Sequence, residues 1–285
     1  MTAFPRTAVG DVSVSRLIIG TNWFLGHTHS THGQSRTNAE RVCHRDAVAG
    51  IIQAFVEYGV DSIMCPHTDT VIPEAIEEAR QRTGQPLVVI STFGLPMTRR
   101  TALDGFDLGE VERVLDAQAA RGVDIAMPHQ SVTDAMLDKC SRELRQIAPV
   151  CTQIRARKMA PGLSTHAPEA VVYADESGLD VETYIQPYNL MGFLMQVEVD
   201  WISRIIQGAK KPVMTIKSMA AGQVRPFQAL TFSWNSIRPC DMVTVGTSSV
   251  HEARELCEMS LQILARQPLT QELQKTRSKA SITPQ

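Results

Sequence analysis

The sequence predicts an α/β protein with the (β/α)8 architecture of a TIM barrel, and three observations support this prediction. The stretches 59–67 and 122–129 repeat one pattern, in which a helix-ending glycine precedes a short apolar run, a proline and a histidine. This pattern is typical of a parallel strand with a polar side chain at its C-terminal end. Eight apolar runs of strand length alternate with amphipathic stretches of helical length. No glycine fingerprint follows the first run, which favours a closed barrel over an open, doubly wound sheet.

The first half of the chain supplies four of the eight expected strands. Val48, Ile51, Ile52 and Phe55 recur at helical spacing and form the apolar face of the first helix. Pro73 stands in the first turn of the next helix, where proline is favoured. The expected strands are residues 17–20, 61–65, 86–91 and 123–127, and the expected helices are residues 45–58, 73–82 and 108–121.

The second half supplies the other four strands. Gly178 ends the helix that begins at Pro168, because glycine is favoured just after a helix C-terminus. No linker rich in Gly, Pro or Ser divides the chain, so we expect one domain over residues 1–266 and a polar tail over residues 267–285. The expected strands are residues 159–163, 181–185, 212–216 and 241–245, and the expected helices are residues 133–147, 168–176, 199–207, 227–235 and 250–265, with a helical turn near 153–157.

The composition excludes several classes of function. The chain has 28 Lys and Arg against 30 Asp and Glu, a net charge of −2. Its sequence contains no basic run, so we expect no nucleic-acid partner. No apolar stretch approaches the roughly 18 residues of a membrane span, and residues 1–15 lack a secretory signal. The six cysteines show no metal or redox spacing, which favours the cytoplasm. The apolar surface of helix 250–265 is compatible with a homo-oligomer.

Three of the eight histidines stand where expected strands end. In a barrel, catalytic groups lie at the C-terminal ends of the strands, and His67, His129 and His166 end the second, fourth and fifth strands. Converging neutral imidazoles can bind a divalent metal or act as general acids and bases near neutral pH. Asp69 would then orient His67 or bind the metal. The alternative is that each histidine hydrogen-bonds a neighbouring loop.

Other strand ends carry polar residues suited to binding a small substrate. Lys217 ends the seventh strand, where an amine serves as an electrostatic clamp or, if desolvation lowers its pKa, as an imine-forming nucleophile; we favour the clamp. Asn22 follows the first strand, and Gln186 and Asn189 follow the sixth, so all three are expected to bind substrate. Trp23 would form an apolar or sugar-stacking wall at the barrel mouth.

The loop after the first strand contains three histidines. His27 and His29 form a His-x-His pair, but the pair lies about seven residues past the strand, too far for a metal pair of the usual barrel type. We therefore expect His29 and His32 to lie in a solvated loop.

The last strand runs into Gly246, Thr247, Ser248 and Ser249, immediately before the final helix. Backbone N–H groups at a helix N-terminus, together with the helix dipole, form an anion site suited to phosphate, and barrels often bind phosphate after their last two strands. Ser249 would also cap this helix without any ligand.

Five stretches together carry a resemblance to one family. They are residues 14–21 for the first strand, 126–130 for the fourth, 162–166 for the fifth, 185–189 for the sixth, and 245–249 with Glu252 and Arg254 for the eighth. These stretches resemble the aldo-keto reductases. The resemblance extends over most of residues 12–265 and implies a (β/α)8 barrel that binds NADP through residues 246–249 and the following helix.

The chain departs from this family at the reductive centre. The family has an Asp and a Tyr after the second strand, a Lys at the end of the third and a His on the fourth. Here residues 64–69 contain no Tyr and residues 91–93 contain no Lys, so only His129 matches. Carbonyl reduction needs a proton donor near the developing alkoxide, so His67 or His129 would have to supply that proton.

These observations predict a non-redox enzyme, a lyase, isomerase or hydrolase, that acts on a small polar carbonyl or hydroxyl compound such as a sugar or sugar derivative. His67, His129 and His166 would act as metal ligands or acid/base groups, while Lys217 and Asn22 polarise the substrate. One alternative is an NADPH-dependent reductase with His129 as the proton donor. Another is a barrel that has lost catalysis and acts as a binding subunit.

Overall fold

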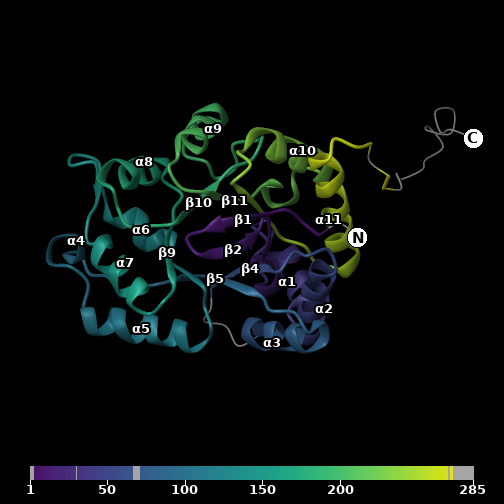
Figure 1. Ribbon diagram of the computed structural model, residues 1–285, viewed down its shortest axis with the longest axis horizontal. Coiled ribbons are helices and arrows are strands. Elements are labelled where there is room, and N and C mark those ends of the chain that lie inside the picture. Colours follow the sequence, from purple (N-terminus) through teal and green to yellow (C-terminus); the bar gives the residue numbers. More distant parts are fainter. Residues whose placement is uncertain (1–2, 30, 67–70, 269, 272–285) are drawn as a thin grey trace, which may run out of the picture.

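Eight parallel strands close into a barrel, as predicted (Figure 1). The computed structural model describes residues 3–29, 31–66, 71–268 and 270–271. The strands follow one another around the barrel in chain order, and the last pairs with the first. They are β3 (Leu17–Gly20), β4 (Ser62–Cys65), β5 (Val88–Phe93), β6 (Ile125–Pro128), β9 (Ala160–Ser164), β10 (Thr183–Pro187), β11 (Val213–Ile216) and β12 (Met242–Val245).

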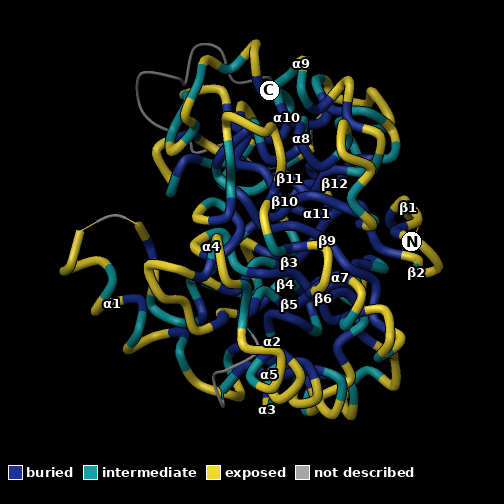
Figure 2. Tube along the Cα trace, turned by 90° about the vertical axis from the view of Figure 1, so that its left-hand side faces the viewer, coloured by how far each residue is buried: buried dark blue, intermediate teal, exposed yellow. Residues whose placement is uncertain are grey.

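Helices cover the outside of the barrel and connect the strands (Figure 1). Their inward faces are buried against the strands, whereas much of their outer surface is exposed, as the dark blue and yellow parts of the trace in Figure 2 show. They are α1 (His32–Val42), α2 (Arg45–Val56), α3 (Val71–Thr83), α5 (Leu108–Ala120), α7 (Ile147–Ala156), α8 (Pro168–Ser177), α9 (Val199–Gly208), α10 (Pro226–Ser236) and α11 (Val250–Leu264), with the short α4 (Thr101–Asp104) before α5.

The expected helix over residues 133–147 is wrong. The chain instead forms the short helices α6 (Gln130–Thr133) and η2 (Asp134–Met136), and then the hairpin of β7 (Leu137–Asp138) and β8 (Glu143–Leu144). The Asp138 carboxylate accepts hydrogen bonds from the Cys140 N–H at 2.9 Å and from the Ser141 hydroxyl, also at 2.9 Å. Such local side-chain bonds favour a turn over a helix, and α7 therefore begins only at Ile147.

An N-terminal hairpin that the sequence pattern did not predict closes one end of the barrel. Strands β1 (Arg6–Val9) and β2 (Val12–Ser15) pair antiparallel just before β3 begins. Val9 and Val14 are fully buried and pack with Ile18, Ile90 and other apolar residues of the barrel interior. Because the hairpin covers the N-terminal ends of the strands, ligands have access only from the opposite, C-terminal end.

Gly162 in β9 lies where no side chain fits. A Cβ atom there would be 2.8 Å from Cγ2 of Thr183 and 3.0 Å from the Thr183 carbonyl oxygen on β10. We expect Gly162→Ala to lower the free energy of unfolding by about 1–3 kcal/mol, measured by urea denaturation, because the neighbouring backbone cannot yield. The control is Gly208→Ala at the end of α9, where an added Cβ meets nothing within 4 Å. Equal stability of the two variants would show that the barrel wall can expand at Gly162.

Candidate active site

A cavity of about 690 Å³ opens at the C-terminal ends of the strands. Its floor is apolar and includes Met64, Ile185 and Ile216, while its walls come from the loops after the strands. Volumes of this size are usual for sites that bind small molecules. Each strand-end residue described below is placed relative to this cavity.

Lys217 lines the cavity immediately after β11. Its backbone has a φ of +62°, a left-handed conformation that residues other than glycine rarely adopt and that is often found at functional sites. Burial lowers the pKa of its ammonium group. In the part of the chain that the structure describes, no carboxylate forms an ion pair with Lys217.

His129 lines the cavity at the end of β6 and also caps α6. Its Nδ1 accepts the Ser131 N–H at 3.3 Å and lies 2.8 Å from the Ser131 hydroxyl. Because Nδ1 is an acceptor, the ring proton of neutral His129 is on Nε2, which remains available to the cavity. Burial lowers the pKa of His129; Asp134 opposes this effect, and Lys217 adds to it.

His166 follows β9 and lies in the same cavity. The backbone N–H of His166 donates to the Asp134 carboxylate at 3.2 Å, and the Thr165 hydroxyl donates to the same carboxylate. Burial, together with the nearby positive charge of Lys217, lowers the pKa of His166 to about 4, so its imidazole is neutral at physiological pH. Asp134 is a positioning residue that sequence analysis missed, because it was assigned to the helix expected over residues 133–147.

His29 is exposed, as expected of a solvated loop, and it also lines the cavity, which we did not predict from the sequence. It lies after the short helix η1 (Asn22–Leu25), with Nε2 3.4 Å from the Asn22 amide nitrogen. Partial burial lowers the pKa of His29, and the positive charge of Lys217 lowers it further. His32 is likewise exposed, at the start of α1, as expected, but it does not line the cavity.

Trp23 forms part of the cavity wall, where the sequence predicted it. Its ring packs against Gly246, since a Cβ at Gly246 would lie 3.4 Å from Trp23 Cδ1. The Asn38 amide of α1 donates to the Trp23 carbonyl oxygen and holds this turn in place. Asn22 lines the cavity beside Trp23 and faces solvent at its mouth.

Gln186 and Asn189, which we expected to bind substrate, do not line the cavity. Side chains alternate along a strand, and because Ile185 of β10 faces the cavity, Gln186 faces the layer of helices. Asn189 is fully buried, and its amide donates to the Phe193 carbonyl at 2.9 Å and accepts the Phe193 N–H, also at 2.9 Å. Asn189 therefore shapes the loop that brings Phe193 to the cavity wall.

The expected phosphate site at residues 246–249 is filled by a carboxylate of the chain itself. Glu252 accepts the Ser248 N–H at 2.8 Å, the Ser248 hydroxyl at 3.0 Å and the Thr247 hydroxyl at 2.7 Å. Ser249 caps α11 by accepting the Glu252 N–H at 3.1 Å. These contacts resemble those of a capping box, and they occupy the Thr247 and Ser248 donors of the expected phosphate site.

Arg254, the other expected cofactor residue, points elsewhere. Its guanidinium group pairs with Glu57 just beyond α2 and does not line the cavity. Glu252 and Glu255 do line it, so this end of the cavity carries two carboxylates. As folded, these residues do not fit the phosphate end of NADP.

The three-histidine metal site cannot be followed in full, because His67 and Asp69 lie outside the described residues. Within the described ranges, no group of three or more His, Cys, Asp and Glu side chains is arranged to hold a metal ion. His129 and His166 share their cavity with the Lys217 ammonium, whose charge disfavours a second cation beside them.

The lowered pKa of His166 predicts a loss of stability in mild acid. In the unfolded chain His166 has a pKa of about 6.5, so as pH falls from 6.5 towards 4 the unfolded state takes up more protons. We therefore expect the free energy of unfolding to fall over this range, by about 2 kcal/mol from this residue once partial exposure to the cavity is allowed for. Denaturant unfolding measures the free energy of unfolding at pH 7.5 and 4.5. Its decrease between the two pH values should be smaller for His166→Asn than for the wild type, and the same as the wild type for the exposed His251→Asn.

The chain was compared with known families and structures. No protein-family model and no curated protein matches it. Among solved structures, a protein of Pseudomonas aeruginosa provisionally assigned as an aldo-keto reductase is 17% identical over 91% of this chain and 96% of its own, with a TM-score of 0.63. The glycerol dehydrogenase of Gluconobacter oxydans is 12% identical over 95% and 98% of the two chains, with a TM-score of 0.57.

A barrel with a different activity also matches. A truncated 3-deoxy-D-arabino-heptulosonate 7-phosphate synthase from Thermotoga maritima is 13% identical over 93% of both chains, with a TM-score of 0.51. At these identities the likeness establishes the fold alone. The chain is thus a (β/α)8 barrel whose fold is similar to that of aldo-keto reductases, which confirms the fold implied by the sequence resemblance. In the described part of the chain, no helix has the length and apolar character needed to cross a membrane.

Proposed function

We propose that the protein is an enzyme that catalyses a non-redox proton transfer, in a lyase or isomerase reaction, on a small polar carbonyl or hydroxyl compound such as a sugar derivative. One observation carries this proposal: Lys217 and the imidazoles of His29, His129 and His166 line one cavity. The fold does not distinguish this chemistry from reduction, because barrels of this type host many reactions, and the structural neighbours include both reductases and a synthase.

The chemical roles follow from charge and tautomer. The Lys217 ammonium binds the substrate carbonyl and stabilises negative charge that develops on its oxygen. His129 donates its Nε2 proton to the same oxygen, since its Nδ1 is occupied by Ser131. His166 or His29, both with lowered pKa values and therefore neutral, accepts the proton from the neighbouring carbon.

Deuterium exchange tests this proposal without knowledge of the product. The protein is incubated in D₂O with a panel of small sugars, sugar acids and hydroxy acids, and loss of the C–H signal next to the carbonyl or carboxyl group is followed by NMR. We expect exchange with at least one compound, without added nicotinamide cofactor. Parallel reactions with EDTA show whether a metal contributes. Absence of exchange across the panel would refute the proposed chemistry.

The likeness to aldo-keto reductases supports a second candidate, an NADPH-dependent reductase. Trp23 lies in the cavity wall, so bound NADPH would quench its fluorescence. Micromolar NADPH affinity together with reduction of simple aldehydes would favour this candidate over the first. We expect neither, because the Thr247 and Ser248 donors already bind Glu252.

A further inference from the structure

In the described part of the chain, Lys217 is a cavity cation without a carboxylate partner. In the described ranges, the groups whose pKa is lowered by the Lys217 charge are the imidazoles of His29, His129 and His166. No carboxylate in these ranges forms an ion pair with Lys217 Nζ. Lys139 and Lys211, by contrast, form ion pairs with carboxylates at the protein surface. A half-buried ammonium group is stabilised when a ligand supplies the missing negative charge.

The residues around the cavity favour a carboxylate over a phosphate as the anion that pairs with Lys217. Phosphate in barrels is usually held by backbone N–H groups near the last strands and a helix N-terminus. Here the Ser248 N–H and the Thr247 and Ser248 hydroxyls are bound to Glu252, and Glu255 adds a second carboxylate at that end. Two cations of the described chain line the cavity, but Arg225 is exposed, whereas Lys217 is partly buried. The one partly buried positive charge matches a single carboxylate rather than a phosphate dianion.

We propose that the substrate is a small 2-hydroxy or 2-oxo carboxylic acid whose carboxylate pairs with Lys217. An ammonium group has three donors, so Lys217 can bind the carboxylate and the neighbouring hydroxyl or carbonyl oxygen together. His129 Nε2 then reaches the same oxygen from β6, and the polyol part of a sugar acid faces Asn22 and His29. This inference rests on the proposed function and adds the class of substrate.

Calorimetric titration with matched ligands tests the proposal. Three acids, glycolate, glycerate and gluconate, are compared with the matching polyols, ethylene glycol, glycerol and glucitol. The phosphate esters of these polyols, which carry a phosphate and no carboxylate, complete the set. We expect measurable affinity for one or more acids, at least tenfold weaker binding of the matching polyol, and weak binding of the phosphate esters. Equal binding of acids and polyols, tighter binding of phosphate esters, or no binding of any acid would overturn the proposal.

Variants of one residue then identify the cation. Lys217→Met is expected to lower the affinity for the acid at least tenfold, whereas Lys217→Arg keeps the charge and retains the preference for acids. The control is Lys158→Met, because Lys158 has a similar φ of +60° but is exposed just before β9 begins, at the opposite end of the barrel. Unchanged acid binding in Lys217→Met, with melting curves like those of the wild type, would also overturn the proposal.

The two proposals fail in different ways. Deuterium exchange with neutral sugars, without acid binding, would reject the carboxylic acid and leave proton transfer standing. Acid binding that depends on Lys217, without exchange of any compound, would reject the proton-transfer function and retain the binding site.

Discussion

A His129→Asn variant is expected to exchange substrate protons about 10²–10⁴ times more slowly than the wild-type protein, the usual contribution of a general acid or base. Asparagine is the informative replacement because its side-chain oxygen can still accept the Ser131 N–H and cap α6. It lacks only a group that can give a proton to the substrate. The rate of deuterium exchange measured by NMR at saturating substrate checks the prediction.

Binding and stability separate a catalytic from a structural role of His129. We expect the asparagine variant to retain the melting temperature of the wild type, because the cap is intact, and to lose less acid affinity than Lys217→Met does, because the cation is intact. His251→Asn, on the exposed side of α11, is the matched control and should exchange at the wild-type rate. A His129→Asn variant that exchanges protons at full rate would exclude His129 from the reaction.

The barrel was predictable because its signal is local and repeated. Each strand is a short apolar run, two of them follow the helix-ending glycines Gly59 and Gly122, and finding eight such runs requires no knowledge of distant contacts. The N-terminal hairpin was not predictable in this way. Val9 and Val14 alternate with polar residues only briefly, and what they cover becomes clear only once the barrel has closed.

The position of a residue at a strand end predicted part of the site. Lys217, His129 and His166 meet in one cavity because parallel strands end on the same side of a barrel. Gln186 shows the limit of this rule, because a shift of one residue along a strand moves a side chain to the other face. Its neighbour Ile185 takes the inward position, and sequence spacing alone did not determine which of the two would do so.

The remaining site residues depend on contacts between distant or irregular segments. His29 reaches the cavity through a loop with a left-handed residue, and no periodic pattern reports such a path. The contact of Glu252 with residues 247 and 248 did leave a signal, a serine followed three residues later by a glutamate. We used only the Ser249 cap from this pattern and did not predict that Glu252 would bind the donors of the expected phosphate site.

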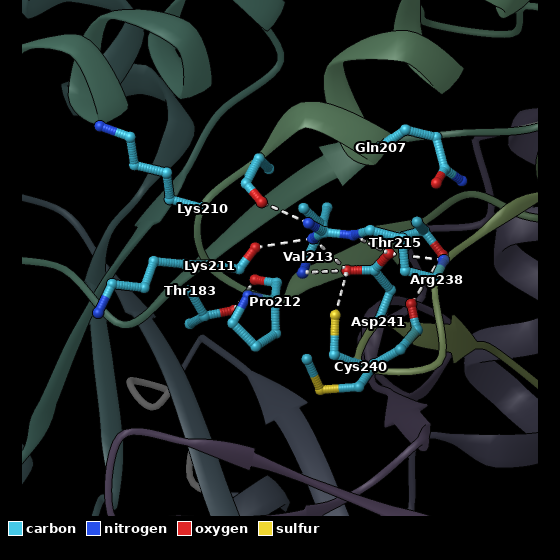
Figure 3. A network of polar contacts seen from close by, with 12 residues as sticks. Thr183, Gln207, Lys210, Lys211, Pro212, Val213, Thr215, Arg238, Cys240 and Asp241 are labelled. Atoms are coloured by element: carbon cyan, nitrogen blue, oxygen red, sulfur yellow. Dashed lines mark hydrogen bonds and ion pairs between the residues drawn. The ribbon is translucent and has the colours of Figure 1, made fainter.

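Replacing Asp241 by Ala is expected to lower the free energy of unfolding by about 3–5 kcal/mol. Asp241 is fully buried and accepts the Arg238 guanidinium in two bonds, of 2.7 Å and 2.9 Å, and the Val213 N–H at 2.8 Å (Figure 3). Arg238 also donates to the carbonyl oxygens of Ala209 and Lys211, so one pair joins the segments before β11 and β12. Without the carboxylate, a largely buried guanidinium group loses its counter-charge and the Val213 N–H loses its acceptor.

An exposed pair of the same chemistry shows whether burial is the cause. Arg100 and Asp104 form a similar two-bond contact, at 2.7 Å and 3.0 Å, but their side chains are 71% and 54% exposed. Asp104→Ala should therefore change the free energy of unfolding by less than about 1 kcal/mol. Urea denaturation at pH 7.5 compares the two variants, and a similar loss in both would mean that the Arg238–Asp241 pair does not hold β11 and β12 together. Because Lys217 follows β11 directly, any loosening at Asp241 short of unfolding should also weaken acid binding in the cavity.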